Sequence, residues 1–284
     1  MSTVKVSSNF ETSKQKVWEA ITNPEIMKVW YFDLSNFKLE IGNEFSFYEP
    51  DGKEFFHKCE ILNFDENEML QHTWTHPEQS KGCSIVTWTI EELESGKVEV
   101  TLTHEGLDSF ADGGEKFAPA NYEMGWNALV KTSLRNYLYN IKRLIFTQEI
   151  NASASDVWNK MWDKDLYPKW ATIFCEGSYY IGEMEMGNRI HFLTPKGEGM
   201  FSDVVYMTKD NLMILSHIGM LSDFKEMALD AETERWTGSF EIYRLEEKGA
   251  KTIVTAEADC VDKYVSYMNE KFPLALQELK KISE

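Results

Sequence analysis

Two histidines are the first candidates for chemistry in this sequence. His72 and His217 occupy matching positions when the chain is aligned with itself at an offset of 145 residues. Both fall on predicted strands, and a histidine that points into an apolar cavity can orient a ligand or act as a base. The alternative is a strand histidine that hydrogen-bonds a neighbour or faces solvent. The sequence leaves both interpretations open.

Large aromatic side chains are the second kind of candidate. Aromatic residues make up 13% of the 284 residues and include nine Trp, so many rings must lie in a core or around a cavity. The alternative for each ring is that it fills the core, because apolar alternation demands burial and nothing more. The residues predicted to bind a ligand are Trp30, Phe47, Phe56, His72, Trp74, Trp88, Tyr122, Trp126, Trp170, Phe192, His217, Trp236, Tyr243, Tyr264 and Met268.

Motifs for catalysis, metals and cofactors are missing from the sequence. It has no Gly-x-Ser-x-Gly, no Gly-rich phosphate loop and no Rossmann fingerprint. Its six histidines lack the spacing of metal ligands, and its four cysteines form no Cys-x-x-Cys. Three carboxylates on predicted strands, Glu49, Glu60 and Asp203, are candidates to project inward. We therefore name no catalytic residue and expect neither a metal nor a cofactor.

The elements that would position these residues occur twice. Residues 13–30 match residues 153–170 through a Ser, a Val-Trp pair and a Trp. Residues 42–72 match residues 187–217 without a gap, through Gly-Asn, several aromatic residues, an Asp and a final His. A period this long exceeds that of solenoid repeats, so each copy should be a whole domain.

Each copy shows the same order of predicted elements. A strand is followed by two short helices, the first beginning at a capping Ser (Ser13 and Ser155), and then by five strands separated by tight turns. Strands that follow one another so closely imply an antiparallel meander. We therefore predict an α+β fold with two helix-grip domains, at residues 1–141 and 142–284. Each would be a curved antiparallel sheet that grips a long C-terminal helix.

The two terminal helices are predicted from apolar residues that recur at steps of three and four. The pattern extends over residues 122–141 in the first copy and 264–282 in the second. Pro273 lacks a backbone N–H, so a break or kink is expected near it. Residues 219–235 form an insertion relative to the first copy, which we interpret as a loop that either gates a pocket or is an ordinary excursion.

The net charge of −18 disfavours nucleic acids and anionic membrane surfaces as partners. No stretch of about 18 apolar residues appears, so membrane insertion is not expected. The first ten residues, MSTVKVSSNF, have neither a basic nor an apolar region of the kind found in signal peptides. We expect a cytoplasmic protein with reduced cysteines.

Several words of the first copy resemble a known family. They are VWEAITNPEIMKVW at residues 17–30, TLTHEGL at residues 101–107 and the Gly125-Trp126 pair that opens the last helix. The first copy is similar to the activators of the heat-shock-protein-90 ATPase, within the START/SRPBCC superfamily of helix-grip proteins. Members of the family commonly carry a His three residues before that Gly, and here the position is Tyr122.

The second copy resembles the same superfamily through VWNKMW, PKGEGMFSDV and FPLALQELKKI. The resemblance implies the helix-grip fold. It also implies a range of functions, because the superfamily includes lipid carriers, hormone binders, aromatic cyclases and co-chaperones.

Three functions follow as hypotheses. The leading one is non-catalytic binding of a small hydrophobic or amphipathic ligand, in which one copy keeps an open cavity and the other is filled. The first alternative is an enzyme of cyclase or hydrolase type that acts on a small aromatic substrate, which would require an acid/base pair inside a cavity. The second is a stress-related co-chaperone or protein-interaction module with a chaperone or other protein partner, which would require an exposed apolar surface.

Overall fold

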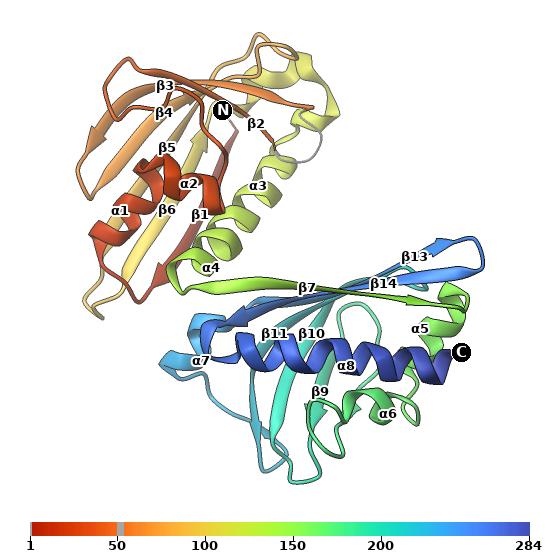
Figure 1. Ribbon diagram of the computed structural model, residues 1–284. Coiled ribbons are helices and arrows are strands. Elements are labelled where there is room, and N and C mark those ends of the chain that lie inside the picture. Colours follow the sequence, from red (N-terminus) through yellow and green to blue (C-terminus); the bar gives the residue numbers. More distant parts are fainter. Residues whose placement is uncertain (1, 50–53) are drawn as a thin grey trace. The chain divides into compact units, whose positions relative to one another are not determined.

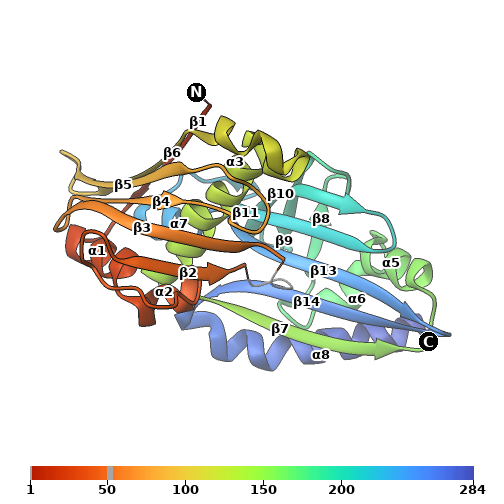
Figure 2. The same cartoon turned by 90° about the horizontal axis from the view of Figure 1, so that it is seen from above.

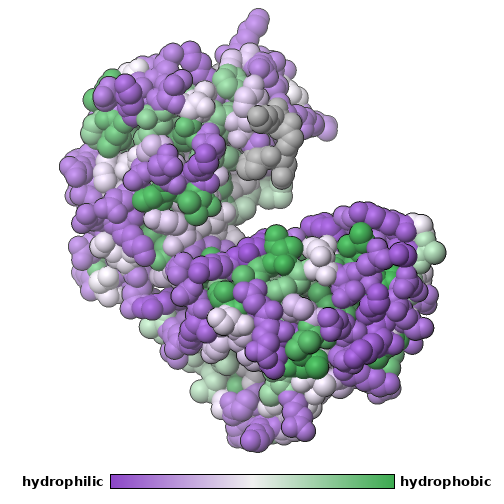
Figure 3. All heavy atoms as spheres, viewed as in Figure 1, coloured by the Kyte–Doolittle hydropathy of each residue, from purple (hydrophilic) through white to green (hydrophobic). Residues whose placement is uncertain are grey.

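The chain folds into two compact units, which a computed structural model describes over residues 2–49 and 54–284. The units are Met1–Leu138 and Tyr139–Glu284, called the first and second domains below. Figure 1 shows that each combines a curved sheet with a helix lying across it. The face shown in Figure 3 is mostly hydrophilic with scattered hydrophobic patches, as expected for the strongly acidic composition.

The first domain begins with a strand and two short helices, continues with five strands and ends in a helical segment. Its elements are β1 (Thr3–Phe10), α1 (Lys14–Thr22), α2 (Pro24–Trp30), β2 (Glu44–Tyr48), β3 (Phe56–Asp65), β4 (Met69–Trp74), β5 (Ser84–Glu92), β6 (Val98–Glu105), two 3₁₀ turns (Leu107–Gly113 and Glu115–Phe117), α3 (Pro119–Ala128), a π-helical turn (Leu129–Leu134) and α4 (Arg135–Leu138).

The second domain repeats this order with three additional short elements. Its elements are β7 (Ile141–Ile150), α5 (Ala154–Trp162), α6 (Tyr167–Ala171), β8 (Tyr179–Ile181), β9 (Arg189–Leu193), β10 (Gly199–Thr208), β11 (Leu212–Ser222), β12 (Lys225–Glu226), α7 (Ala231–Trp236), β13 (Ser239–Lys248), β14 (Lys251–Val261), a 3₁₀ turn (Asp262–Tyr264) and α8 (Val265–Ser283). The additions relative to the first domain are β8, β12 and α7.

Both sheets are antiparallel, as the predicted meander requires. Within the described residues the first sheet has the order β1-β6-β5-β4-β3-β2, and the second has the order β7-β14-β13-β11-β10-β9-β8 with β12 attached to β11. In the second domain α8 runs alongside β7, as Figure 2 shows. The predicted α+β helix-grip architecture is confirmed in both domains.

Matching serines begin the first helix of each domain. The Ser13 side chain accepts a hydrogen bond from the backbone N–H of Lys16 at 3.2 Å, and the Ser153 side chain accepts one from the N–H of Asp156 at 3.1 Å. The cap predicted at Ser155 is therefore wrong, because Ser155 lies inside α5. The repeat itself pointed to Ser153, which aligns with Ser13.

The terminal helical segment of the first domain is less regular than its sequence pattern predicts, and it both begins and ends three residues earlier. A π-helical turn separates α3 from α4, which ends at Leu138, and Ile141 already belongs to β7. In the second domain the break expected near Pro273 does not occur, because α8 is one helix from Val265 to Ser283. Buried Phe272 and Leu276 hold α8 against the core on both sides of the proline, which offsets the one missing hydrogen bond.

Backbone hydrogen bonds show how the two sheets correspond. The N–H of Gly42 donates to the carbonyl of Ile61 at 2.8 Å, and the N–H of the matching Gly187 donates to the carbonyl of Val204 at 2.7 Å. Ile61 is therefore the structural counterpart of Val204, at an offset of 143 residues instead of 145. The hairpin between β9 and β10 is two residues shorter than the hairpin between β2 and β3.

This slip changes the correspondence of the two candidate histidines. Ile61 pairs with His72, whereas Val204 pairs with Leu215. The counterpart of His72 is thus Leu215, and the counterpart of His217 is Trp74. The equivalence inferred from the ungapped alignment is wrong, because two residues are lost in a turn where they leave no mark on the hydrophobic pattern.

The insertion at residues 219–235 is ordered secondary structure instead of the predicted loop. It contains the end of β11, the short strand β12 and the first part of α7. The hairpin between β11 and β12 has a two-residue turn, Asp223-Phe224, with positive φ values of 49° and 64°. Two positive φ values are the signature of a type I′ turn, which matches the twist of the paired strands.

Candidate functional site

A cavity of about 600 Å³ lies inside the second domain, between the sheet, α6 and α8. All seven residues predicted to bind a ligand in this half of the chain line it. They are Trp170, Phe192, His217, Trp236, Tyr243, Tyr264 and Met268. The wall is mostly apolar and aromatic, with a few polar groups, which is the usual composition of small-molecule sites.

The strand β13 supplies one wall through alternate residues. Ser239, Glu241 and Tyr243 are spaced by two and line the cavity together, because successive side chains of a strand point to opposite faces. On the neighbouring strand, Ala258 pairs with Glu241 and Ala256 pairs with Tyr243. The two methyl side chains fill little space, which leaves room above β14.

The residues of the first domain that correspond to Ala256, Ala258 and Glu241 can be identified from the pairing of β1 with β6 and of β7 with β14. Phe10 pairs with Val98, and its repeat counterpart Ile150 pairs with Thr252. The offset on the last strand is therefore 154 residues.

At this offset Ala256 and Ala258 take the places of Leu102 and His104. Because Val86 pairs with His104 as Glu241 pairs with Ala258, Glu241 stands where the first domain has buried Val86.

A chain of polar contacts reaches the cavity wall. The Ser202 hydroxyl lies 2.8 Å from Nδ1 of His217, and Nε2 of His217 lies 3.3 Å from Oε2 of Glu241. The Tyr243 hydroxyl donates a hydrogen bond to Oε1 of Glu241. Ser202 is fully buried and does not line the cavity, so it orients the imidazole from behind.

Two further residues of the wall, Asp259 and Cys260, are poor candidates for a reactive group. Asp259 accepts hydrogen bonds from Nε and Nη2 of Arg143, at 2.8 and 3.0 Å, and from the N–H of Phe240 at 2.9 Å. Burial, reinforced by Asp259, raises the pKa of the Cys260 thiol to about 11. Cys260 therefore stays a neutral thiol and is a poor nucleophile.

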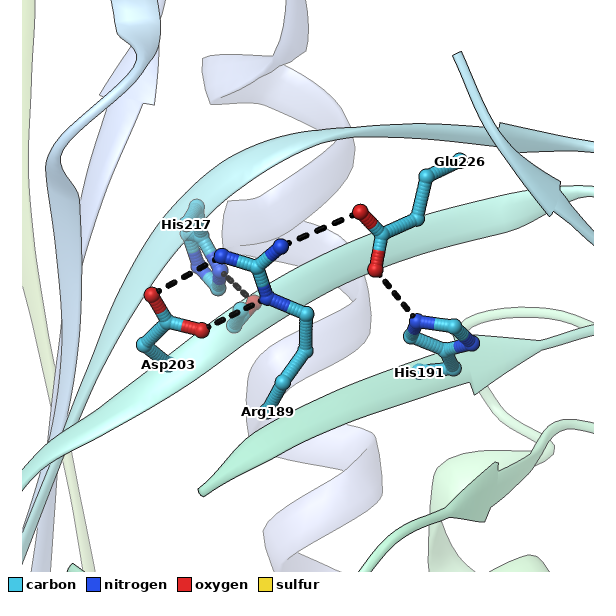
Figure 4. Close-up of polar contacts among 6 residues, drawn as sticks. Arg189, His191, Asp203, His217 and Glu226 are labelled. Carbon is cyan, nitrogen blue, oxygen red and sulfur yellow. Dashed lines mark hydrogen bonds and ion pairs between the residues drawn. The ribbon is translucent and has the colours of Figure 1, made fainter. Parts of the chain in front are cut away.

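The insertion forms part of the cavity wall and is fastened by ion pairs. Glu226 of β12 contacts Nη1 of Arg189 at 3.0 Å and Nε2 of His191 at 2.8 Å, both on β9 (Figure 4). From α7, Glu232 pairs with Lys263 at the start of the terminal helical segment. These contacts hold the segment that contributes Thr233 and Trp236 to the wall.

The residues predicted in the first domain pack against one another. The Trp126 ring lies 5.1 Å from Trp74 and 6.1 Å from Trp88 between centroids, and Trp30 lies 6.2 Å from Trp88. All four rings are buried. Phe47 joins this cluster through Trp74 at 5.4 Å.

The other three predicted residues of the first domain have separate environments. His72 is buried beside Phe45, and its Nδ1 lies 2.8 Å from the carbonyl of Thr73. The Tyr122 hydroxyl lies 2.8 Å from Nε2 of His76. Phe56 is half-buried and packs on exposed Tyr48 at 4.9 Å, away from the tryptophan cluster.

A buried histidine completes the cluster of the first domain. The indole N–H of Trp126 donates to Nδ1 of His104 at 3.0 Å, so the neutral ring carries its proton on Nε2, which lies 2.6 Å from the Ser84 hydroxyl. Burial lowers the pKa of His104 to about 3. Both ring nitrogens are satisfied without a ligand.

Sequence reasoning did not find Glu241, the carboxylate of the cavity wall that contacts His217 and Tyr243. Of the three carboxylates proposed to project inward, Asp203 binds Arg189, Glu60 is exposed and Glu49 lies 3.2 Å from His57. Glu241 was missed although it lies two residues from Tyr243 on a predicted strand, so strand alternation was the available signal. Among the described residues no group of three or more His, Cys, Asp or Glu side chains could hold a metal.

Comparison with known proteins supports the same fold. Residues 11–139 match the family described as Activator of Hsp90 ATPase homolog 1-like protein. The chain is a tandem helix-grip protein that resembles this family in its first domain. No curated protein matches the chain. In the described part of this helix-grip protein, no helix is long and apolar enough to cross a membrane.

Solved structures match either about half of the chain or nearly all of it. A protein from Mesorhizobium loti is 24% identical, with a TM-score of 0.42, covering 48% of this chain and 96% of its own. DynU16, described as a putative protein in the dynemicin biosynthetic locus, is 15% identical with a TM-score of 0.40 and covers 99% of both chains. The di-domain ARO/CYC StfQ from the steffimycin biosynthetic pathway is 11% identical with a TM-score of 0.39, covering 99% of this chain and 96% of its own.

Proposed function

We propose that the second domain binds a small hydrophobic or amphipathic ligand in its cavity. The observation that supports this most directly is the cavity of about 600 Å³, walled by aromatic rings and bordered by the small side chain of Ala258 on β14. A void lined by large apolar side chains forgoes packing energy, so an occupant that restores those contacts would be stabilised there.

The size of the expected affinity follows from burial. Removing roughly 200 Å² of apolar ligand surface from water contributes about 5 kcal/mol at 25 cal/mol per Å². Loss of translational and rotational freedom offsets about 4 kcal/mol or more of this gain. Apolar contact alone therefore gives weak binding, and the polar contacts at His217 and Glu241 would add orientation.

The test is equilibrium binding to alkyl and aromatic probes, followed by tryptophan fluorescence because Trp170 and Trp236 line the cavity. Thermal shift provides a second readout. The variant Ala258→Leu should abolish binding by filling the space above β14. Its matched control is Thr255→Leu, which places a leucine on the same strand but on the opposite face of the sheet. This variant should bind the probes as the wild-type protein does. If no probe class binds the wild-type protein, the proposal fails.

A catalytic role is favoured by one observation. His217 and Glu241 both line the cavity and lie 3.3 Å apart, which is the arrangement of an acid/base pair. Turnover of an aromatic polyketide-like substrate that is lost in His217→Gln, with binding retained, would support an enzyme. Binding without turnover in the wild-type protein would support a carrier.

A further inference from the structure

We propose that the ligand is an amphipathic amine, whose ammonium group contacts Glu241 while its apolar part lies among the aromatic rings. This inference rests on the proposed function, because it concerns the occupant of the same cavity. It is carried by the charges around the wall, which have one sign.

Carboxylates outnumber cations at the cavity. Five Asp or Glu residues line it, namely Glu198, Asp230, Glu232, Glu241 and Asp259, and the described lining contains no Lys or Arg. An anionic ligand would bring a further negative charge into this low-dielectric space without a cation to pair with. Burying such a charge is strongly unfavourable, so the wall excludes anions as well as attracting cations.

Two cations that contact residues of this wall are already engaged. Arg143 binds Asp259, whose side chain is fully buried, through two hydrogen bonds. Lys263 binds Glu232. Neither side chain is left to receive a ligand carboxylate or phosphate, and two of the five carboxylates are neutralised by these pairs.

Glu241 is the carboxylate best placed to receive an ammonium group. Its protein contacts are with Tyr243 and His217, and neither partner is Lys or Arg. Glu241 is 19% exposed and faces the cavity from the first half of β13. A hydrogen bond to an ionised partner in such a setting is stronger than one between neutral groups.

His217 does not supply an anion site. Its Nδ1 contacts the buried Ser202 hydroxyl, and its Nε2 faces Glu241. Both ring nitrogens therefore have protein partners, and no N–H remains for a ligand carboxylate. Trp236 acts in the same direction, because it lines the cavity and ring faces attract cations. The rings of Tyr264 and Tyr267 already carry the Nζ atoms of Lys263 and Lys271, at 4.9 and 6.0 Å from the ring centroids.

Three probes with one alkyl chain test the head group. Decylamine, decanol and decanoate are titrated separately below their micelle-forming concentrations at about pH 7.5, where an alkylamine is protonated and a carboxylate is ionised. We expect decylamine to bind about tenfold more tightly than decanol, and decanoate to bind more weakly than both. Glu241→Gln, which keeps the shape of the side chain, should bring decylamine to within about threefold of decanol and leave decanol unchanged.

The matched control is Glu257→Gln, which removes the same charge from neighbouring β14. Glu257 is 20% exposed, close to the 19% of Glu241, and does not line the cavity. It should keep the preference for decylamine. Retention of the full preference in Glu241→Gln would overturn the role of Glu241.

The probes also separate this inference from the proposed function. If decanoate binds as tightly as decylamine or more tightly, the amine assignment is wrong while ligand binding stands. If neither these three probes nor the aromatic probes bind the wild-type protein, both the amine assignment and the proposed ligand binding are wrong. The wild-type comparison remains decisive even if Glu241→Gln fails to fold.

Discussion

The two domains share one topology but differ in how their interiors are packed. In the described part of the first domain, the rings of Trp74, Trp88 and Trp126 pack edge to face and fill the interior, so it is called the closed domain below, whereas the second domain has a cavity of about 600 Å³. Part of the difference lies on β6 and β14, where Ala256 and Ala258 replace Leu102 and His104. The rest lies on β13 and in α7, which supply Glu241 and Trp236 to the wall. One topology can therefore enclose either a packed set of rings or a cavity.

Acid is the largest expected perturbation, and it should act on the closed domain. Burial lowers the pKa of His72 to about 4 and the pKa values of His76 and His104 to about 3. The unfolded chain takes up these protons below about pH 6.5, while the folded domain does not. Stability present above pH 6.5 is thus lost on acidification, by about 2 kcal/mol per histidine at pH 5 and at most about 6 kcal/mol in all.

Hydrogen exchange at pH 7.5 and pH 5, corrected for intrinsic rates, measures this effect domain by domain. Peptides from β4, β5 and β6 should lose more protection than peptides from β13 and β14. The variant His72→Leu introduces the residue that the second domain carries at Leu215, and it should reduce the pH dependence by about 2 kcal/mol. An unchanged dependence in this variant would contradict the contribution of His72.

Removing a buried ring from the closed domain should have the next largest effect. Trp126→Ala removes a fully packed ring and leaves Nδ1 of His104 without its donor, so the free energy of unfolding should fall by about 3 to 5 kcal/mol. Met268→Ala removes a half-buried side chain that lines an existing cavity, and should cost about 1 kcal/mol. Urea denaturation measures both. Equal losses would show that the two interiors are packed alike.

Loosening the insertion gives the smallest effect. Glu226→Gln removes the ion pairs with Arg189 and His191, and partly exposed pairs contribute below about 1 kcal/mol. Exchange of β12 and α7 should accelerate, more at low salt than at high salt. Glu246→Gln is the control, because Glu246 is exposed and lies 3.9 Å from Lys248. Equal acceleration in both variants would argue against a specific fastening.

The fold was largely predictable because its signals are local and occur twice. Strand alternation, the helical apolar stripe and the capping Ser13 each act over a few residues, and the repeat provided a second copy of every signal. One error arose where tertiary packing overrides a local rule. Pro273 should end a helix on local grounds, yet buried Phe272 and Leu276 hold α8 together across it.

The candidate site was predictable as a set of rings but not as a charge pattern. The sequence marks Trp170, Phe192 and Tyr243 as inward, and the cavity wall contains them. It does not show that Leu215 is the counterpart of His72 in the second domain, because a two-residue difference in the length of a turn leaves no mark on the hydrophobic pattern. Whether rings surround a void or fill it depends on the small residues opposite them, such as Ala258, and a single alanine carries little information.

The turn at Asp223-Phe224 combines backbone strain with a tertiary contact in one residue. A phenylalanine at a φ of 64° is strained by about 1 kcal/mol, yet its N–H donates to the Gly197 carbonyl at 3.0 Å and its ring lies against the glycine, where a Cβ would come within 2.6 Å. Replacing Phe224 with glycine would relieve the strain and keep the N–H donor, but it would remove the ring and give the unfolded chain more freedom. The contact with Gly197 thus ties this hairpin to the turn between β9 and β10, and order at one turn depends on the other.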